Sequence, residues 1–270
     1  MFKDITIGQY IEGDSFIHKM DARMKILLGM FYIIILFIIS TPAAYAAFTL
    51  FTALLIIVSK MPFKYIVRGL KPMLYILVFT AVINLFMTQG QTILWVCPFW
   101  SALKITQEGL RTAVLMILRL VYLVIGTSIL TLTTSPLMLT DGIESLLKPF
   151  EIIKLPSHEI AMMMTIAIRF IPTLSEETEK IIKAQTARGA DFESGNIFRR
   201  AKAMVPLLVP LFISAFRRAD DLAVAMDARC YNGGKNRTRM KQMKMTARDA
   251  FAAIFMLIFA VVVIAMQKVM

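Results

Sequence analysis

The sequence is poor in the residues that build metal sites and catalytic centres. It holds two cysteines and two histidines, and their spacing fits no common metal site. The phosphate-binding pattern GxxxxGK[ST] is missing, since Gly233-Gly234-Lys235-Asn236 has neither its spacing nor its final hydroxyl residue. No set of nucleophile and base is recognisable either. We therefore predict no catalytic residues, no metal and no cofactor in this chain, and no ability to hydrolyse ATP alone.

Charged residues are absent from four long stretches, although the chain carries a net charge of +12. Hydrophobic residues make up 58% of the sequence and the mean hydropathy is +0.69, which is typical of an integral membrane protein. A spanning helix needs about 20 apolar residues. The first stretch is long enough for two spans separated near Pro42, so five spans are predicted, and no cleavable leader. The charge-free stretches are 26–59, 72–103, 120–140 and 250–267. The predicted spans are 25–41, 43–59, 72–88, 111–133 and 249–267.

The distribution of basic residues predicts how the chain lies in the membrane. Lysines and arginines concentrate in 60–71 and 235–248, whereas the loop 89–110 carries one lysine and one glutamate. Short loops rich in Lys and Arg stay in the cytoplasm. The N-terminus is therefore predicted inside and the C-terminus outside, which puts Cys97 and Cys230 on opposite sides. The basic excess is explained by topology and by contact with anionic lipid, so no nucleic-acid partner is expected.

The predicted architecture is an all-α membrane protein in three parts. Residues 1–133 form an N-terminal segment and transmembrane helices 1–4, and 249–270 form the last one. The part between them, 134–248, is cytoplasmic or lies on the inner membrane surface. Its first section predicts a short amphipathic helix over 141–148, because apolar residues recur there at helical spacing before Pro149.

Two stretches of that middle part share one design. Each opens with an apolar half too short to cross a bilayer, turns charged, and ends at Ala-Arg followed by a small residue. The first runs over about 159–189 and ends at Ala187-Arg188-Gly189; the second runs over about 204–230 and ends at Ala228-Arg229-Cys230. The two arginines lie 41 positions apart (229 − 188). Both stretches predict long helices that end at their arginine.

Two interpretations of these arginines are open. A cation near a helix C-terminus complements the macrodipole by roughly 0.3–1 kcal/mol and needs no partner. Alternatively, Arg188 and Arg229 bind a partner protein, because a guanidinium donates up to five hydrogen bonds and arginine is enriched at interface hot spots. A small neighbour on each side would let a partner's backbone approach. The matched pair favours the second interpretation.

Three segments resemble the transmembrane T subunit of energy-coupling factor (ECF) transporters. Residues 10–25 are similar to that family's N-terminal signature, Thr186-Ala-Arg-Gly-Ala-Asp-Phe192 to its first coupling motif, and 217–231 to the stretch carrying its second. The resemblance covers nearly the whole chain. It departs from the family pattern at Cys230, where glycine is frequent, and this concerns only how closely a partner can approach.

The resemblance implies a function that the composition alone does not. T subunits are non-catalytic scaffolds of the cell membrane that join two ATP-binding-cassette (ABC) ATPases to a membrane S component. The S component binds a vitamin or a metal ion, and ATP and magnesium are bound by the ATPases. The resemblance also implies that 134–248 is a coupling domain. Ala187, Arg188 and Gly189 would dock on one ATPase, and Ala228, Arg229 and Cys230 on the other.

Two other functions are possible for a membrane protein of this composition. A secondary transporter or permease would bind its substrate itself, and it would need charged groups in mid-span or paired broken helices. A membrane enzyme would need a nucleophile with its base, or metal ligands. The sequence shows neither set, so both rivals are disfavoured.

Overall fold

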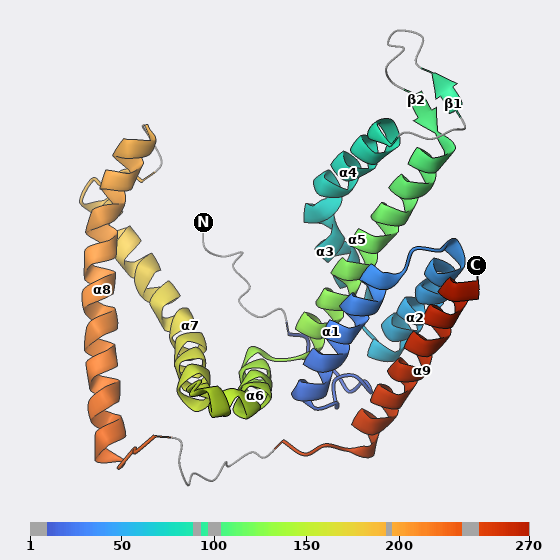
Figure 1. The fold of residues 1–270 in the computed structure, drawn as a ribbon. Coiled ribbons are helices and arrows are strands. Elements are labelled where there is room, and N and C mark those ends of the chain that lie inside the picture. The colour runs from blue at the N-terminus through green and yellow to red at the C-terminus, as the bar shows by residue number, and fades with distance from the viewer. Residues whose placement is uncertain (1–9, 89–92, 97–103, 193–195, 234–242, 270) are drawn as a thin grey trace. The chain divides into compact units, whose positions relative to one another are not determined.

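The computed structural model describes residues 10–88, 93–96, 104–192, 196–233 and 243–269 (Figure 1). Its long elements are all helices, which confirms the all-α fold class. In chain order the helices are α1 (Ala22–Ile38), α2 (Pro42–Ser59), α3 (Phe63–Leu70), α4 (Leu74–Met87), α5 (Gln107–Thr133), α6 (Pro136–Leu147), α7 (Ser157–Ala187), α8 (Ile197–Ala228) and α9 (Ala247–Val269). Two short 3₁₀ helices, η1 (Lys71–Met73) and η2 (Lys148–Ile153), continue α3 and α6.

Four helices are long and apolar enough to cross a membrane: Pro42–Ser59, Lys64–Met87, Gln107–Thr133 and Ala247–Lys268. Each covers one of the predicted spans to within one residue. The remaining predicted span, 25–41, corresponds to α1, whose 17 residues are at the lower limit for crossing. α2 begins at Pro42, as expected from proline's preference for the first helical position. α7 and α8 are not among the four spanning helices.

Two of the segments that connect the predicted spans differ from the sequence-based expectation. The basic segment after α2 was expected to be a loop, but Lys64 and Arg68 lie in α3 and Lys71 begins η1. Pro72 does not interrupt this helix because it stands in the first turn of η1, where its missing N–H costs nothing. The predicted loop after α4 holds a short antiparallel pair, β1 (Ile93–Val96) with β2 (Lys104–Thr106), in which Val96 lies opposite Lys104.

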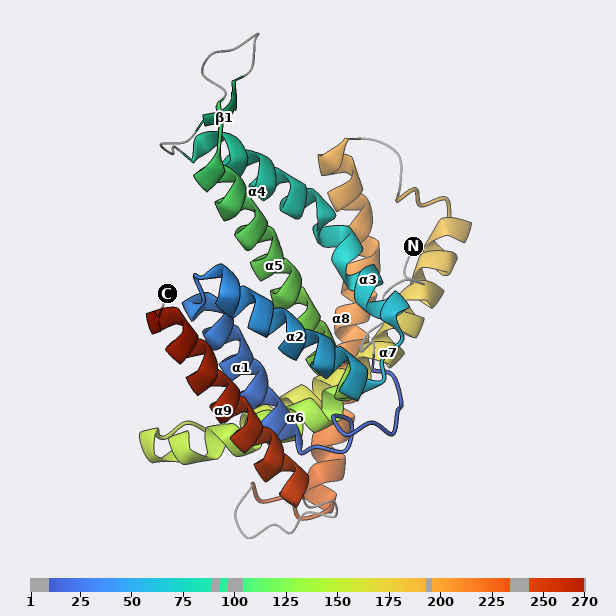
Figure 2. The same ribbon diagram turned by 90° about the vertical axis from the view of Figure 1, so that its right-hand side faces the viewer.

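The chain divides into two compact units, 8–142 with 242–270, and 143–241 with 1–7. In the first unit α1, α2, α5 and α9 pack against one another (Figure 2), and they enclose a buried aromatic cluster. Phe51 of α2 stacks on Phe259 of α9 with 4.1 Å between ring centroids. Phe48 lies 4.8 Å from Tyr32 and 5.5 Å from Tyr122. Stacked and tilted aromatic pairs stabilise such a core beyond the area that they bury.

A glycine allows α1 and α5 to approach closely within this core. The ring of buried Tyr32 in α1 lies over Gly126 of α5, and an added Cβ at Gly126 would stand 2.4 Å from the Tyr32 ring. The Tyr32 hydroxyl donates to the carbonyl oxygen of Tyr122 at 3.0 Å. Small residues at such contacts allow membrane helices to pack at short distance. Gly126 therefore fixes the distance between these two helices.

A network of hydrogen bonds holds the N-terminal segment, residues 11–21, in place within this unit. His18 Nε2 donates to the carbonyl oxygen of Ile11 at 3.0 Å, so its Nδ1 accepts from the Ser15 hydroxyl at 2.6 Å. Asp249, at the start of α9, accepts the backbone N–H of Asp21 at 2.9 Å, and Asp21 itself caps α1. These bonds tie the N-terminal ends of α1 and α9 together.

The second unit is built on two long helices, α7 and α8, which run in opposite directions in space (Figure 1). Their ends agree with the sequence prediction within two residues, except that α8 begins at Ile197 rather than about 204. Pro172 lies inside α7, and Pro206 and Pro210 lie inside α8. Proline inside a helix removes one backbone hydrogen bond, so each helix is interrupted once or twice in its apolar half.

Candidate functional site

The last turn of α7 is closed by a Schellman motif. Gly189 has a φ of 87°, and its N–H donates to the carbonyl oxygen of Thr186 at 3.0 Å. The next N–H, that of Ala190, reaches back to the carbonyl oxygen of Gln185, also at 3.0 Å. These two bonds satisfy carbonyl groups that a helix end otherwise leaves unpaired. Arg188 stands at the C-cap position just before the turn.

The last turn of α8 is closed in the same way. Cys230 has a φ of 54°, and its N–H donates to the carbonyl oxygen of Asp227 at 2.8 Å. The N–H of Tyr231 then reaches back to the carbonyl oxygen of Met226 at 3.0 Å. Arg229 therefore occupies the position that Arg188 has in α7. The sequence match over 41 positions corresponds to a match of backbone geometry.

Cys230 adopts a left-handed conformation that glycine adopts without strain. An L residue with a side chain pays roughly 1–2 kcal/mol there, whereas Gly189 does not. No atom lies within 4 Å of the position that a Cβ on Gly189 would take. A side chain at position 189 would therefore cost backbone strain without a steric clash.

We expect Gly189→Ala and Cys230→Gly to change the two helix ends in opposite directions. Alanine at 189 should weaken the first cap by about 1 kcal/mol, since only its φ is unfavourable. Amide exchange of Ala190 should then speed up about fivefold. Glycine at 230 should slow exchange of the Tyr231 amide. Equal exchange rates in all variants would show that the left-handed residue does not govern either cap.

The six tip residues form exposed ends of the two helices. Ala187, Arg188 and Gly189 are exposed, and so are Ala228, Arg229 and Cys230. Within the described part of the chain, neither guanidinium forms a hydrogen bond or an ion pair. Each arginine lies at the negative end of a helix dipole, but this contact uses little of its hydrogen-bonding capacity. Both guanidinium groups are therefore available to a partner.

A second set of polar residues joins α7 to α8, and the sequence-based reasoning missed it. Glu177 of α7 accepts a hydrogen bond from the Ser214 hydroxyl at 2.6 Å and one from Arg218 Nη2 at 3.0 Å. Ser214 and Arg218 stand four residues apart, and this spacing places them on one face of α8. That spacing was the available signal, but it does not identify the partner helix.

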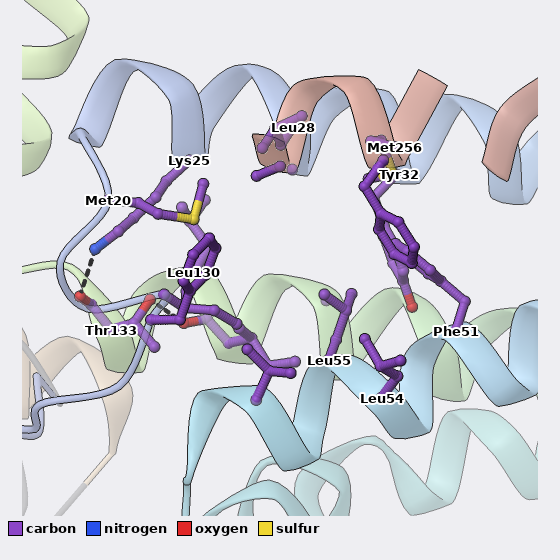
Figure 3. Close-up of a pocket in the computed structure, with 18 of the residues that line it drawn as sticks. Met20, Lys25, Leu28, Tyr32, Phe51, Leu54, Leu55, Leu130, Thr133 and Met256 are labelled. Carbon is purple, nitrogen blue, oxygen red and sulfur yellow. Dashed lines mark hydrogen bonds between the residues drawn. The ribbon is translucent and has the colours of Figure 1, made fainter. Parts of the chain in front are cut away.

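A cavity of about 470 Å³ lies among α1, α2, α5 and α9 (Figure 3). Its lining is apolar apart from a few groups; leucines such as Leu54, Leu55 and Leu130 are typical of it. Lys25 is the charged side chain in this lining, and its ammonium already donates to the carbonyl oxygens of His18 at 3.2 Å and Thr133 at 2.9 Å. The cavity does not offer the converging polar groups that a site for a polar solute needs.

No candidate metal centre is found among the residues that the structure describes. None of their His, Cys, Asp and Glu side chains form a group of three that could hold a metal ion. His158 Nδ1 and Glu144 Oε1 lie 3.1 Å apart and form a hydrogen-bonded pair.

Comparisons with known proteins cover both helix tips. A family model described as cobalt transport protein, CbiQ, matches residues 13–240. An energy-coupling factor transporter transmembrane protein of Clostridium kluyveri is 58% identical over 260 residues, which are 96% of this chain and 95% of that protein. One from Ruminiclostridium cellulolyticum is 54% identical and covers 100% of this chain and 99% of its own length. One from Bacillus subtilis is 44% identical, with 96% and 97% covered.

Proposed function

Because the chain belongs to the family of energy-coupling factor transporter transmembrane proteins, we propose that it couples ATP hydrolysis by partner proteins to transport across the cell membrane. Membership confirms the resemblance noted from the sequence, and it makes the chain a multi-pass membrane subunit of a transporter. The finer proposal is that two ABC ATPases dock on this chain and that a membrane S component binds the cargo, a vitamin or a metal ion. The N-terminus and the two helix tips would face the cytoplasm.

One observation carries this proposal. Two exposed arginines stand at equivalent positions of two identically capped helix ends, and neither has a partner within the described chain. An arginine that served only its own helix dipole would need neither the repeated cap nor the small residues on both sides. Two equivalent sites instead suit two copies of similar ATPases, each offering carboxylates or carbonyl groups to one guanidinium.

The rival function of a secondary transporter has less support. Such a protein holds its substrate with polar groups near the membrane midplane. The 470 Å³ cavity lies among the apolar helices of the first unit, and its ammonium group is already bonded to two backbone carbonyl groups. An apolar cavity of this kind does not suit a polar vitamin or a hydrated metal ion.

Co-purification tests the proposal directly. We expect the tagged chain, expressed with the ABC ATPases encoded beside transporter genes of its own genome, to bring down two ATPase subunits per chain. We also expect the purified chain alone to show no ATP hydrolysis. Quantitative mass spectrometry gives the ratio, and phosphate release gives the activity. Transport by the chain alone in vesicles would favour the rival function.

A further inference from the structure

The ion pair between α7 and α8 lies where each helix changes from mainly apolar to mainly charged residues. Glu177 follows the apolar half of α7, and Arg218 follows the apolar half of α8. Both carboxylate oxygens of Glu177 are used, one by the Ser214 hydroxyl and one by the Arg218 guanidinium. The side chains of Glu177 and Arg218 remain 25% and 35% exposed. Charge-assisted bonds are stronger than neutral ones.

The two partners occupy equivalent positions. Glu177 precedes Arg188 by 11 residues (188 − 177), and Arg218 precedes Arg229 by the same number (229 − 218). Eleven residues make about three helical turns. Each charged group therefore lies on nearly the same helix face as the arginine at the tip of its own helix. The segment from ion pair to tip is equally long, about 16 Å, in both helices.

These two equal segments are also the regular parts of their helices. Neither 177–187 nor 218–228 contains glycine or proline, whereas Pro172, Pro206 and Pro210 all lie on the other side of the ion pair. A helix without interruption bends little, and sharp kinks are concentrated at proline. The tips are thus connected to the ion pair by stiff segments, and the more deformable segments lie beyond it.

A weaker contact between α7 and α8 lies closer to the α7 tip. Pro210 has no N–H, so the carbonyl oxygen of Pro206 has no partner one helical turn later. Gln185 Nε2 of α7 donates to that oxygen at 3.5 Å. The proline therefore frees an acceptor in α8 that α7 uses near its tip. Of the ion pairs that the described residues form, Glu177–Arg218 is the one that joins α7 to α8.

We propose that Glu177, held by Ser214 and Arg218, is the pivot about which α7 and α8 turn, so that displacement of one arginine tip is transmitted to the other. This inference rests on the proposed function. The proposal makes these three residues positioning residues, because their side chains bond to one another and act on the tips only through the two helices. Their role is to keep the point where α7 and α8 cross, the contact between Glu177 and Arg218, at the same distance from both tips.

Distance measurements on the chain alone test the crossing. Spin labels on Lys183→Cys and Val224→Cys, two exposed positions 41 residues apart, report the tip-to-tip distance in a Cys97→Ser, Cys230→Gly background in lipid nanodiscs. We expect a narrow distribution for the parent, a broad or shifted one for Glu177→Gln, and the parent distribution for Glu176→Gln, its exposed neighbour. The exchange Glu177→Arg with Arg218→Glu should narrow the distribution again. An unchanged distribution in Glu177→Gln would overturn the proposal.

The complex tests transmission separately from docking. In the parent bound to its ATPases, ATP with vanadate should shift the tip-to-tip distance. In Glu177→Gln the ATPases should remain bound, whereas the shift should be lost and return with the exchanged pair. Loss of ATPase binding together with an unchanged distance distribution would instead assign Glu177 to docking and overturn the pivot. If the parent binds no ATPase, the proposed function fails, whatever the nanodisc distances show about the crossing.

Discussion

Charge reversal at both tips, Arg188→Glu with Arg229→Glu, is expected to abolish ATPase binding while the chain still inserts and folds. A carboxylate would meet the carboxylate or carbonyl groups that the proposed docking grooves offer to a guanidinium. Leaving a buried charged partner unpaired costs about 2–5 kcal/mol, so each tip should lose roughly 30-fold to 5000-fold in affinity. Titration of labelled ATPase against chain in nanodiscs measures this loss.

The same chain provides a matched control. Lys180→Glu with Arg217→Glu makes the same change of net charge on the same two helices, at exposed positions away from the tips. This variant should bind the ATPases within a few-fold of the parent, because exposed surface charges contribute only about 0–1 kcal/mol. If both double variants lose binding equally, the ATPases recognise the general charge of these helices and the tips are not docking sites.

Gly126→Ala is expected to lower the stability of the membrane helices by about 1–3 kcal/mol. The new Cβ would stand 2.4 Å from the Tyr32 ring, so the ring or one of the helices must move. Movement of the ring would also weaken the bond from the Tyr32 hydroxyl to the Tyr122 carbonyl oxygen. Denaturant unfolding in detergent, followed by far-UV circular dichroism, measures the decrease in the free energy of unfolding.

Gly29→Ala serves as the control for this substitution. A Cβ at Gly29 would lie 3.7 Å from Leu130, which is an ordinary van der Waals distance. Because alanine is the better helix former by roughly 0.5–1 kcal/mol, this variant should be as stable as the parent or slightly more so. Equal destabilisation by both substitutions would show that the Tyr32 contact is not what limits position 126.

The membrane part of the fold could be predicted because a bilayer leaves few alternatives. Backbone groups in lipid must bond within the helix, so a charge-free stretch of sufficient length identifies a span. Pro42 marked the division of the first stretch because proline is favoured where a helix starts. The basic segment with Lys64 and Arg68 was misjudged for a related reason: charge marks the membrane boundary, but it does not end a helix.

The helix tips were predicted in position but not in conformation. Ala187 and Ala228 end their helices as the Ala-Arg-small pattern indicated. Glycine at 189 predicts a left-handed residue at the end of α7, whereas cysteine at 230 does not predict one at the end of α8. The repeat over 41 positions was the only sequence signal that both residues share one backbone geometry.

The start of α8 and its crossing with α7 could not be predicted. Pro206 and Pro210 suggested a helix that begins near 204, yet the helix continues back to Ile197. The carbonyl oxygen that Pro210 leaves free is bonded by Gln185 of α7, a contact that no local pattern predicts. The ion pair joins residues 41 positions apart in the chain. No local pattern distinguishes Glu177 from Glu176 or Glu179 as the partner of Arg218, since the choice depends on the crossing itself.

The equal spacing of Glu177 and Arg218 from their tips has a consequence for symmetry. If α7 and α8 turn against each other about this point, both arginines travel through arcs of the same radius. At about 16 Å, a turn of about 20° carries each guanidinium about 6 Å. The two arginines would then move by equal distances, although they belong to different helices of one chain. Two ATPases docked on them would therefore contribute equally to the movement.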